Sequence, residues 1–174
     1  MAKVRKFVAY RRMERPYTRK SKYREKSFIR GDPRSKVIRW NMGDAKGDYD
    51  YTLTLHNKAD LQIRDRAIES ARLVINRHAE KKIGIGQYYF RIKCYPHHHL
   101  RENALASGAG ADRLSTGMKF SFGKVVDIAA QCFAGKELFS LSVKKSDLEK
   151  AKKIIHLAAT KLPGSVYVRV KELK

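Results

Sequence analysis

The sequence predicts an α+β fold in which a mixed, mainly antiparallel sheet packs against two helices. Three observations support this fold class: strand-like alternation is more frequent than helical periodicity, neighbouring strand patterns are joined by short connections, and two amphipathic helical patterns lie between strands. The predicted order is strand, strand, helix, strand, a long loop, and then strand, strand, helix, strand. Both helices are expected to cover the sheet.

The first predicted strands lie at 37–43 and 49–56, and we expect them to pair as a hairpin. A helix is predicted from Leu61 to about Ile83, with Asp60 as its N-cap and apolar residues at helical spacing on one side.

The next predicted strand, 87–95, alternates between a buried face and a face of Tyr89, Arg91, Lys93 and Tyr95. This second face is either ordinary solvent surface or a nucleic-acid contact.

The second half repeats the arrangement. Strands are predicted at 125–133 and 137–143, joined by a tight turn at 134–136. Ser146 and Glu149 have the spacing of a capping box, which predicts the start of the second helix, and Pro163 and Gly164 end it. The alternating valines of 166–171 predict a closing strand.

A long segment from His97 to Lys124 separates the two halves. It is rich in Gly, Ala and Ser and is basic at both ends. Loops longer than about 12 to 15 residues are uncommon inside a compact domain and are usually functional or disordered. We therefore expect this loop to contact the protein's partner.

The net charge is +22 at pH 7, and more than half of it, +12, lies in the first 40 residues. A surplus of this size favours a polyanionic partner, and nucleic acid is the first choice. Residues 1–34 alternate cations with aromatic rings and lack a sustained helical or strand period. This composition predicts a basic, aromatic-rich extension that RNA or DNA orders, because rings can stack on bases while cations pair with phosphates. Residues 35–174 are then expected to form a single α+β domain.

The two cysteines, Cys94 and Cys132, lie in strand-like runs without metal-binding spacing, which predicts reduced core thiols. The chain shows neither a signal peptide nor an apolar run of about 20 residues, so we expect a soluble intracellular protein without a membrane partner.

Metal and nucleotide chemistry are poorly supported. Consecutive side chains of an extended chain alternate in direction, so His97, His98 and His99 are expected to be surface or RNA-facing residues, and no metal is predicted. The glycines at 117 and 123, followed by Lys124, resemble part of a Walker A motif. The match fails because five residues separate the glycines and Val125 stands where the motif needs Ser or Thr.

No catalytic group or cofactor is predicted either. Ser107, Ser115 and Cys132 lack a recognisable base and orienting acid. Glu102 and Asp112 are expected to pair with Arg101 and Arg113 inside the loop. The remaining alternative is an RNA-modifying or RNA-processing enzyme that uses the same loop as its active site.

The loop sequence LRENALASGAGADRLSTGM, followed by FGK, closely resembles the signature of the archaeal and eukaryotic L-ten-e ribosomal proteins, the counterparts of bacterial L-sixteen. The segment RPYTRKSKYREKSFIRGDPRSKVIRW resembles the start of the same family. The resemblance implies an α/β-hammerhead type of fold and a non-enzymatic, structural role in the large ribosomal subunit. It also implies a cytoplasmic, ribosomal location, rRNA binding near the base of the central protuberance, and a loop that helps position tRNA in the A and P sites.

The same resemblance implies two groups of binding residues. Ribosomal RNA would be bound by the N-terminal segment and the ends of the loop, through Arg11, Arg12, Arg15, Tyr17, Arg19, Lys20, Lys22, Arg24, Arg30, Arg34, Lys36, His97 and Lys124. The loop would face tRNA through Arg101, Glu102, Asn103, Ser107, Gly108, Ala109, Gly110, Ala111, Asp112 and Arg113. Further implied partners are neighbouring ribosomal proteins and 5S rRNA as a candidate neighbour, and outside the ribosome the chain is expected to be a monomer.

Overall fold

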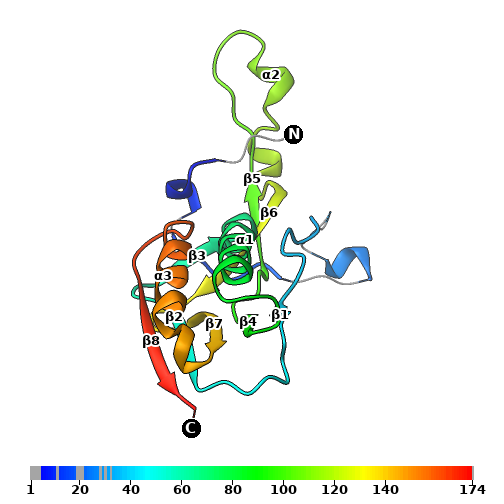
Figure 1. Cartoon of the computed structure of the whole chain (residues 1–174). Helices are drawn as coiled ribbons and strands as arrows, with labels where there is room; N and C mark the ends of the chain where they lie inside the picture. The colour runs from blue at the N-terminus through cyan, green and yellow to red at the C-terminus, as the bar shows by residue number, and fades with distance from the viewer. Residues whose placement is uncertain are drawn as a thin grey trace.

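Two antiparallel sheets and two long helices form the body of the protein in a computed structural model that describes residues 5–10, 12–18, 22–27, 29, 31 and 33–173 (Figure 1). The larger sheet has the strand order β1 (Asn41–Gly43), β4 (Tyr88–Ile92), β7 (Glu137–Val143), β2 (Tyr51–Asn57) and β8 (Val166–Glu172). The smaller sheet has the order β3 (Leu61–Arg64), β6 (Lys124–Cys132) and β5 (His98–Glu102). The predicted α+β class and its antiparallel pairing are confirmed, although the strands divide into two sheets.

The main core lies between the larger sheet and the helices α1 (Asp65–Lys82) and α3 (Leu148–Ala159). Apolar residues three or four positions apart give each helix one buried stripe, made of Ile68, Ala71, Ile75 and Ala79 in α1 and of Ala151, Ile154, Ile155 and Ala158 in α3. The strands contribute Leu53, Leu55, Phe90, Phe139 and Leu141, which are fully buried. Cys94 and Cys132 are buried free thiols, as predicted.

Five short helical segments complete the described chain: η1 (Phe7–Tyr10) and η2 (Arg24–Lys26) before the body, α2 (Ala111–Leu114) and η3 (Met118–Phe120) between β5 and β6, and η4 (Lys145–Asp147) before α3. Among the described residues, none of the helices combines the length and apolarity that crossing a lipid bilayer requires.

The start of the first long helix differs from the prediction. Leu61–Arg64 forms β3 and pairs with β6, so the helix begins at Asp65. The carboxylate of Asp65 accepts hydrogen bonds from the backbone N–H groups of Arg66 (2.7 Å) and Lys36 (3.0 Å). Asp60 is therefore not the N-cap, and its carboxylate instead accepts the N–H of Ala134 at 2.7 Å.

Two further local predictions were wrong. The strands β1 and β2 do not form a hairpin, because β1 pairs with β4 while β2 lies between β7 and β8. The capping box does not form: η4 precedes α3, the hydroxyl of Ser146 donates to Asp147 (3.1 Å), and Glu149 pairs with Lys152 (2.7 Å).

Asn57 joins the two sheets at the end of β2. Its side-chain amide donates to the carbonyl oxygens of Ala59 (2.8 Å), Cys132 (3.1 Å) and Phe133 (2.8 Å). The backbone carbonyl of Asn57 accepts the N–H of Gly135 at 2.9 Å, in the turn through which the chain passes from β6 in one sheet to β7 in the other. A fully buried amide thus satisfies carbonyl groups that neither sheet can pair.

Replacing Asn57 by Ala is expected to lower the free energy of unfolding by roughly 2 kcal/mol, because the buried Cys132 carbonyl and two partly buried carbonyls lose their donor. Urea unfolding would measure the change. Asn41→Ala is the matched control, since Asn41 is exposed and makes only a surface contact with the Tyr89 hydroxyl. Equal effects of the two substitutions would contradict a joining role for Asn57.

Candidate RNA interface

The N-terminal segment lies across the outer face of the smaller sheet. The inner face of that sheet carries Ile63, Ala130 and Cys132 into the core. On the outer face, Gln62 and Gln131 are cross-strand partners, and both are buried. Gln62 Nε2 donates to the carbonyl oxygens of Tyr10 and Arg12, at 2.9 Å each, and Gln131 Nε2 donates to the carbonyl of Glu14 at 2.9 Å. The two glutamines therefore bind the backbone of the segment.

A second set of contacts fixes Tyr17 to β5. The backbone N–H of Tyr17 donates to His98 Nδ1 at 2.9 Å, and the Tyr17 carbonyl accepts from the His99 backbone N–H at 3.1 Å and from His99 Nδ1 at 2.8 Å. These bonds require His98 to be unprotonated at Nδ1 and His99 to carry a proton there. Both rings are buried, so the expectation of surface histidines was wrong for these two.

Burial and charge act together on His98. Desolvation is the main cause that lowers the pKa of His98 to about 4, and the nearby charges of His97, Arg101 and His99 act in the same direction. The ring is therefore neutral near pH 7 and can accept the Tyr17 N–H.

Arg101 forms a clamp at the base of the loop. Its guanidinium carbon lies 3.8 Å from the centre of the Tyr17 ring and 3.9 Å from that of Phe122, and the two rings meet edge to face. Its Nη1 donates to the Phe122 carbonyl at 2.8 Å. Stacking of this kind stabilises by roughly 0.5 to 2 kcal/mol. The clamp holds together the N-terminal segment and both legs of the loop.

Glu102, the neighbour of Arg101, also binds the segment. Its carboxylate accepts from Arg5 Nε at 2.8 Å, while Arg64 donates to the Arg5 carbonyl at 2.9 Å. The expected pairing of Glu102 and Asp112 with the arginines inside the loop was wrong: within the described residues Asp112 makes no ion pair, and Glu102 pairs with Arg5.

The loop begins as a two-stranded stalk and ends in an exposed tip. Its first residues form β5, which pairs with β6, so the predicted loop is shorter at both ends. Beyond the strands, Asn103 accepts the hydroxyl of Thr116 at 2.9 Å, and Ser115 Oγ accepts the N–H of Ala106 at 2.9 Å. These side-chain bonds join the legs up to the tip, which projects away from both sheets and carries α2 (Figure 1).

Gly123 allows the legs to approach each other at the base of the stalk. Its φ angle is +77°, and a Cβ atom there would lie 2.8 Å from the backbone oxygen of Glu102. Any other residue at this position would adopt a strained φ angle, and its Cβ would push the two strands of the stalk apart.

A buried carboxylate, that of Asp127, binds Lys36, which lies just after the N-terminal segment. It is 1% exposed and lies 3.3 Å from both Lys36 Nζ and Arg66 Nε. The same Lys36 reaches Asp65 through its backbone N–H. Burial is the main cause that raises the pKa of Asp65, and the nearby Asp127 adds to it.

The predicted rRNA-binding residues fall into three groups. Arg11, Arg19, Lys20 and Arg30 lie outside the described residues, as does the side chain of Arg24. Exposed positions are occupied by Arg12, Arg15, Lys22, Arg34 and Lys124. Three residues have internal contacts: Tyr17 in the clamp, Lys36 at Asp127, and His97, whose ring Nδ1 bonds to the Tyr95 carbonyl at 2.9 Å.

In the predicted tRNA-facing group, the structure places Arg101 and Glu102 at the base of the stalk, in contact with the segment. Positions 107–110 and 112–113 are exposed at the tip, with Asn103 and Ala111 half-buried. Sequence reasoning missed Gln62, Gln131 and Phe122. A polar residue in an otherwise buried strand, as at Gln62 and Gln131, is the signal that could have found two of them.

Within the described residues no group of three His, Cys, Asp or Glu side chains could hold a metal ion. A polar cavity of about 200 Å³ does lie between the segment and β5, and is lined by Ala9, Tyr10, Arg12, Glu14, Gln62, His98, His99, Leu100 and Arg101.

Comparison with known proteins agrees with this basic, loop-bearing architecture. The family model for ribosomal protein L16p/L10e matches residues 10–169. The chain belongs to the ribosomal protein L16p/L10e family. This confirms the resemblance that the loop and N-terminal motifs indicate, and it makes the chain a structural ribosomal protein rather than an enzyme.

Archaeal proteins named large ribosomal subunit protein uL16 are similar along most of the chain. That of Hyperthermus butylicus is 41% identical over 159 residues, which cover 91% of this chain and 85% of the relative. That of Archaeoglobus fulgidus is 39% identical over 163 residues, covering 94% and 90%. That of Nanoarchaeum equitans is 38% identical over 181 residues, covering 100% and 96%.

The pKa of His98 predicts a pH dependence of stability. An unfolded histidine takes up a proton near pH 6.5, whereas the folded His98 does so only near pH 4. The free energy of unfolding should therefore fall as the pH is lowered from about 6.5 to 4, because the unfolded chain binds the additional proton in that interval. Urea unfolding at several pH values measures this loss.

The substitution His98→Asn isolates the effect, because the Asn oxygen can still accept the Tyr17 N–H but does not titrate. The loss of stability between pH 6.5 and 4 should be smaller in this variant, while His156→Asn, at an exposed position of α3 remote in sequence from His98, should behave like the unmodified chain. Identical pH profiles for His98→Asn and the unmodified chain would contradict the assignment.

The Arg101 clamp predicts that Arg101→Ala loosens the segment. We expect a loss of roughly 1 to 2 kcal/mol in unfolding free energy and faster proteolysis between residues 5 and 18, because the contact with Tyr17 is lost. Limited trypsin digestion with mass spectrometry measures this. Arg113→Ala, at the exposed tip, is the control and should leave the segment as resistant as before.

Proposed function

We propose that this chain is a structural constituent of the large ribosomal subunit that binds rRNA near the base of the central protuberance and helps position tRNA in the A and P sites. Support comes from the family, from the names of the archaeal relatives, and from the arrangement of charge and loop. The observation that carries the proposal is a projecting tip on a stalk whose base is clamped to the basic N-terminal segment. 5S rRNA and neighbouring ribosomal proteins are further proposed contacts.

The N-terminal segment is suited to a phosphate backbone. Its described cations Arg12, Arg15 and Lys22 are exposed, while its backbone is bound to the smaller sheet. At η2 the exposed ring of Tyr23 has Lys22 and Lys26 near its face, with their Nζ atoms 5.2 and 5.7 Å from the ring centre. Cations beside an exposed ring offer both phosphate pairing and a stacking surface for bases.

The tip of the loop carries apolar side chains that the body does not cover. Leu105, Leu114 and Met118 are 63%, 71% and 76% exposed. Exposed apolar residues grouped on one projection usually mark an interaction site. Within this family the partner at that site is proposed to be tRNA, reached by the tip while the basic body stays on rRNA.

Ribosomal RNA binding predicts a salt effect. Replacing the five exposed cations Arg12, Arg15, Lys22, Lys26 and Arg34 by Ala should flatten the slope of log K against log salt concentration by roughly 3 to 5 units, because fewer counterions are released on binding. Filter binding to large-subunit rRNA fragments at several salt concentrations measures the slope.

The matched control replaces five exposed lysines that lie outside the N-terminal segment, Lys81, Lys144, Lys145, Lys161 and Lys171. This variant has the same net charge but keeps the segment intact. If the control flattens the slope as much as the first variant, long-range charge rather than the segment is responsible.

Positioning of tRNA predicts a separable effect of the tip. Replacing residues 107–113 by a Gly-Ser sequence of the same length should leave rRNA affinity unchanged, because the stalk and the segment are retained. Large subunits reconstituted with this variant should bind A- and P-site tRNA more weakly in filter assays. Unchanged tRNA binding by such subunits would remove the tip from the proposed role.

A further inference from the structure

The helix layer does not cover the whole of the larger sheet. β8 is the outer strand, and its register pairs Val170 with Leu53 and Val168 with Leu55. Paired residues point to the same face, so these valines lie on the face that α1 and α3 cover elsewhere. Leu53 and Leu55 are fully buried, whereas Val168 and Val170 are 36% and 45% exposed. The sheet thus extends one strand beyond α3, and the apolar face of that last strand is exposed to solvent.

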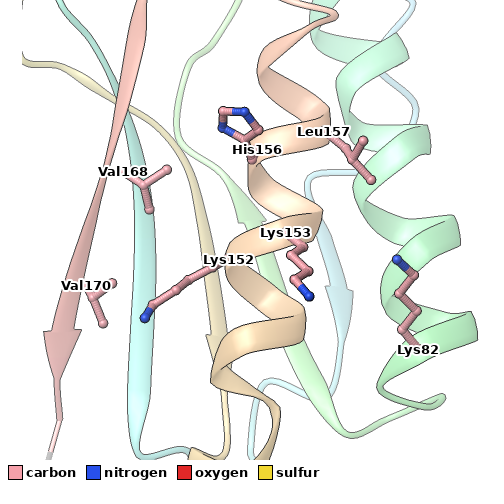
Figure 2. Close-up of a pocket in the computed structure, with 7 residues that line it drawn as sticks. All are labelled: Lys82, Lys152, Lys153, His156, Leu157, Val168 and Val170. Carbon is pink, nitrogen blue, oxygen red and sulfur yellow. The ribbon is translucent and has the colours of Figure 1, made fainter.

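A hollow of about 720 Å³ lies over this uncovered strip and the outer side of α3. Figure 2 shows Val168 and Val170 on β8, Lys152, Lys153, His156 and Leu157 on α3, and Lys82 at the end of α1. Most of the lining surface is apolar, because Leu157 and the two valines face it together with the aliphatic stems of the lysines.

The polar atoms around the hollow are nearly all cationic. Lys152 forms an ion pair with Glu149, with its Nζ 2.7 Å from Glu149 Oε1. Within the described part of the chain, Lys82 and Lys153 have no carboxylate partner. A ligand that covers the valines while supplying two or more carboxylates would match both the apolar floor and the charged edge.

Two other occupants fit less well. Nucleic acid would find the lysines and the single imidazole ring of His156, but the floor itself is made of branched aliphatic side chains, which offer bases no stacking surface. A second copy of this chain would bring the same lysines against each other, which opposes self-association at a net charge of +22.

We propose that this hollow, defined by Lys82, Lys152, Lys153, Leu157, Val168 and Val170, is the docking site of an acidic, amphipathic segment of another protein. Apolar side chains of that segment cover Val168, Val170 and Leu157, and its carboxylates pair with Lys82 and Lys153. The elements that carry the site, β8 and α3, lie away from the projecting tip of the loop in Figure 1, and the site adds a protein contact to the proposed RNA contacts.

Site-directed photo-crosslinking in assembled large subunits tests the proposal. Full-length chain carrying benzoylphenylalanine at Val170 is incorporated into subunits, irradiated, and the crosslinked segment is sequenced by mass spectrometry. The expected product joins Val170 to a segment of a different protein with more Asp and Glu than Lys and Arg and with several apolar residues. The control carries benzoylphenylalanine at Tyr89, on the opposite face of the sheet, and should not crosslink to this segment.

Four results would overturn the proposal: a crosslink to rRNA, a crosslink to a second copy of this chain, a crosslink to a basic segment, or no crosslink above the level of an unirradiated sample. The first would assign the hollow to RNA and the second to self-association. The last would show that nothing covers the strip in the assembled particle.

The crosslinked segment, synthesised as a labelled peptide, then allows affinity to be measured on the full chain by fluorescence anisotropy. The double substitution Lys82→Glu and Lys153→Glu should weaken binding by about tenfold or more, because two ion pairs become repulsive. Lys81→Glu with Lys161→Glu makes the same change of charge outside the hollow and should weaken binding much less. Equal weakening by the two double variants would overturn the site.

A separate variant tests the apolar floor without altering charge. Val170→Thr keeps a branched side chain of similar size and should still support the strand, but it places a hydroxyl under the ligand. Peptide affinity should fall several-fold while the urea midpoint and the rRNA affinity stay close to those of the unmodified chain. Unchanged peptide affinity with this variant would contradict burial of Val170 in the complex.

Discussion

The bonding of Gln62 and Gln131 to the backbone of the N-terminal segment is the interaction on which the rest of the structure depends. Two buried amides on a sheet face would be costly if they lacked partners, and carbonyl groups of the chain 50 to 117 residues away supply them. The described part of the segment is therefore a covering layer of the smaller sheet, and its exposed cations are held in a fixed place. A basic surface of defined shape is the result.

The structure also resolves a conflict between charge and compactness. A chain with a net charge of +22 repels itself, and the few acids that lie inside the N-terminal interface counter this locally. Asp127 pairs with Lys36 and Arg66, and Glu102 pairs with Arg5. Cations near these acids stabilise the fold, whereas exposed cations such as Arg12 and Arg15 remain available to a polyanion. Counting positive residues in the sequence does not separate these two groups.

Much of the fold could be predicted from local patterns. Alternation identified β4 and β7, and helical spacing identified the buried stripe of α3, because each pattern records which side chains face the core. β3 was missed because its four residues directly precede a helix and continue its apolar pattern, and only pairing with β6 makes them a strand. The hairpin of β1 and β2 was wrong for a related reason, since sequence neighbours are paired with distant strands.

The candidate interface was predictable in outline and not in its internal contacts. The loop motif and the basic segment identified the family. The burial of His98 and His99 could not be predicted, because their partner, Tyr17, is about 80 residues earlier in the chain. The family resemblance assigns Arg101 to the tRNA-facing loop, whereas in the structure two rings of the same chain, those of Tyr17 and Phe122, lie against its guanidinium group.

Tyr17 belongs at once to the segment and to the base of the stalk, and this has a mechanical consequence. Its ring lies against Arg101 and Phe122, one on each leg, while its backbone is bonded to His98 and His99. The stalk cannot swing about its base without pulling on this residue and on the chain that follows it. Displacement of the tip is thus coupled through Tyr17 to the basic segment.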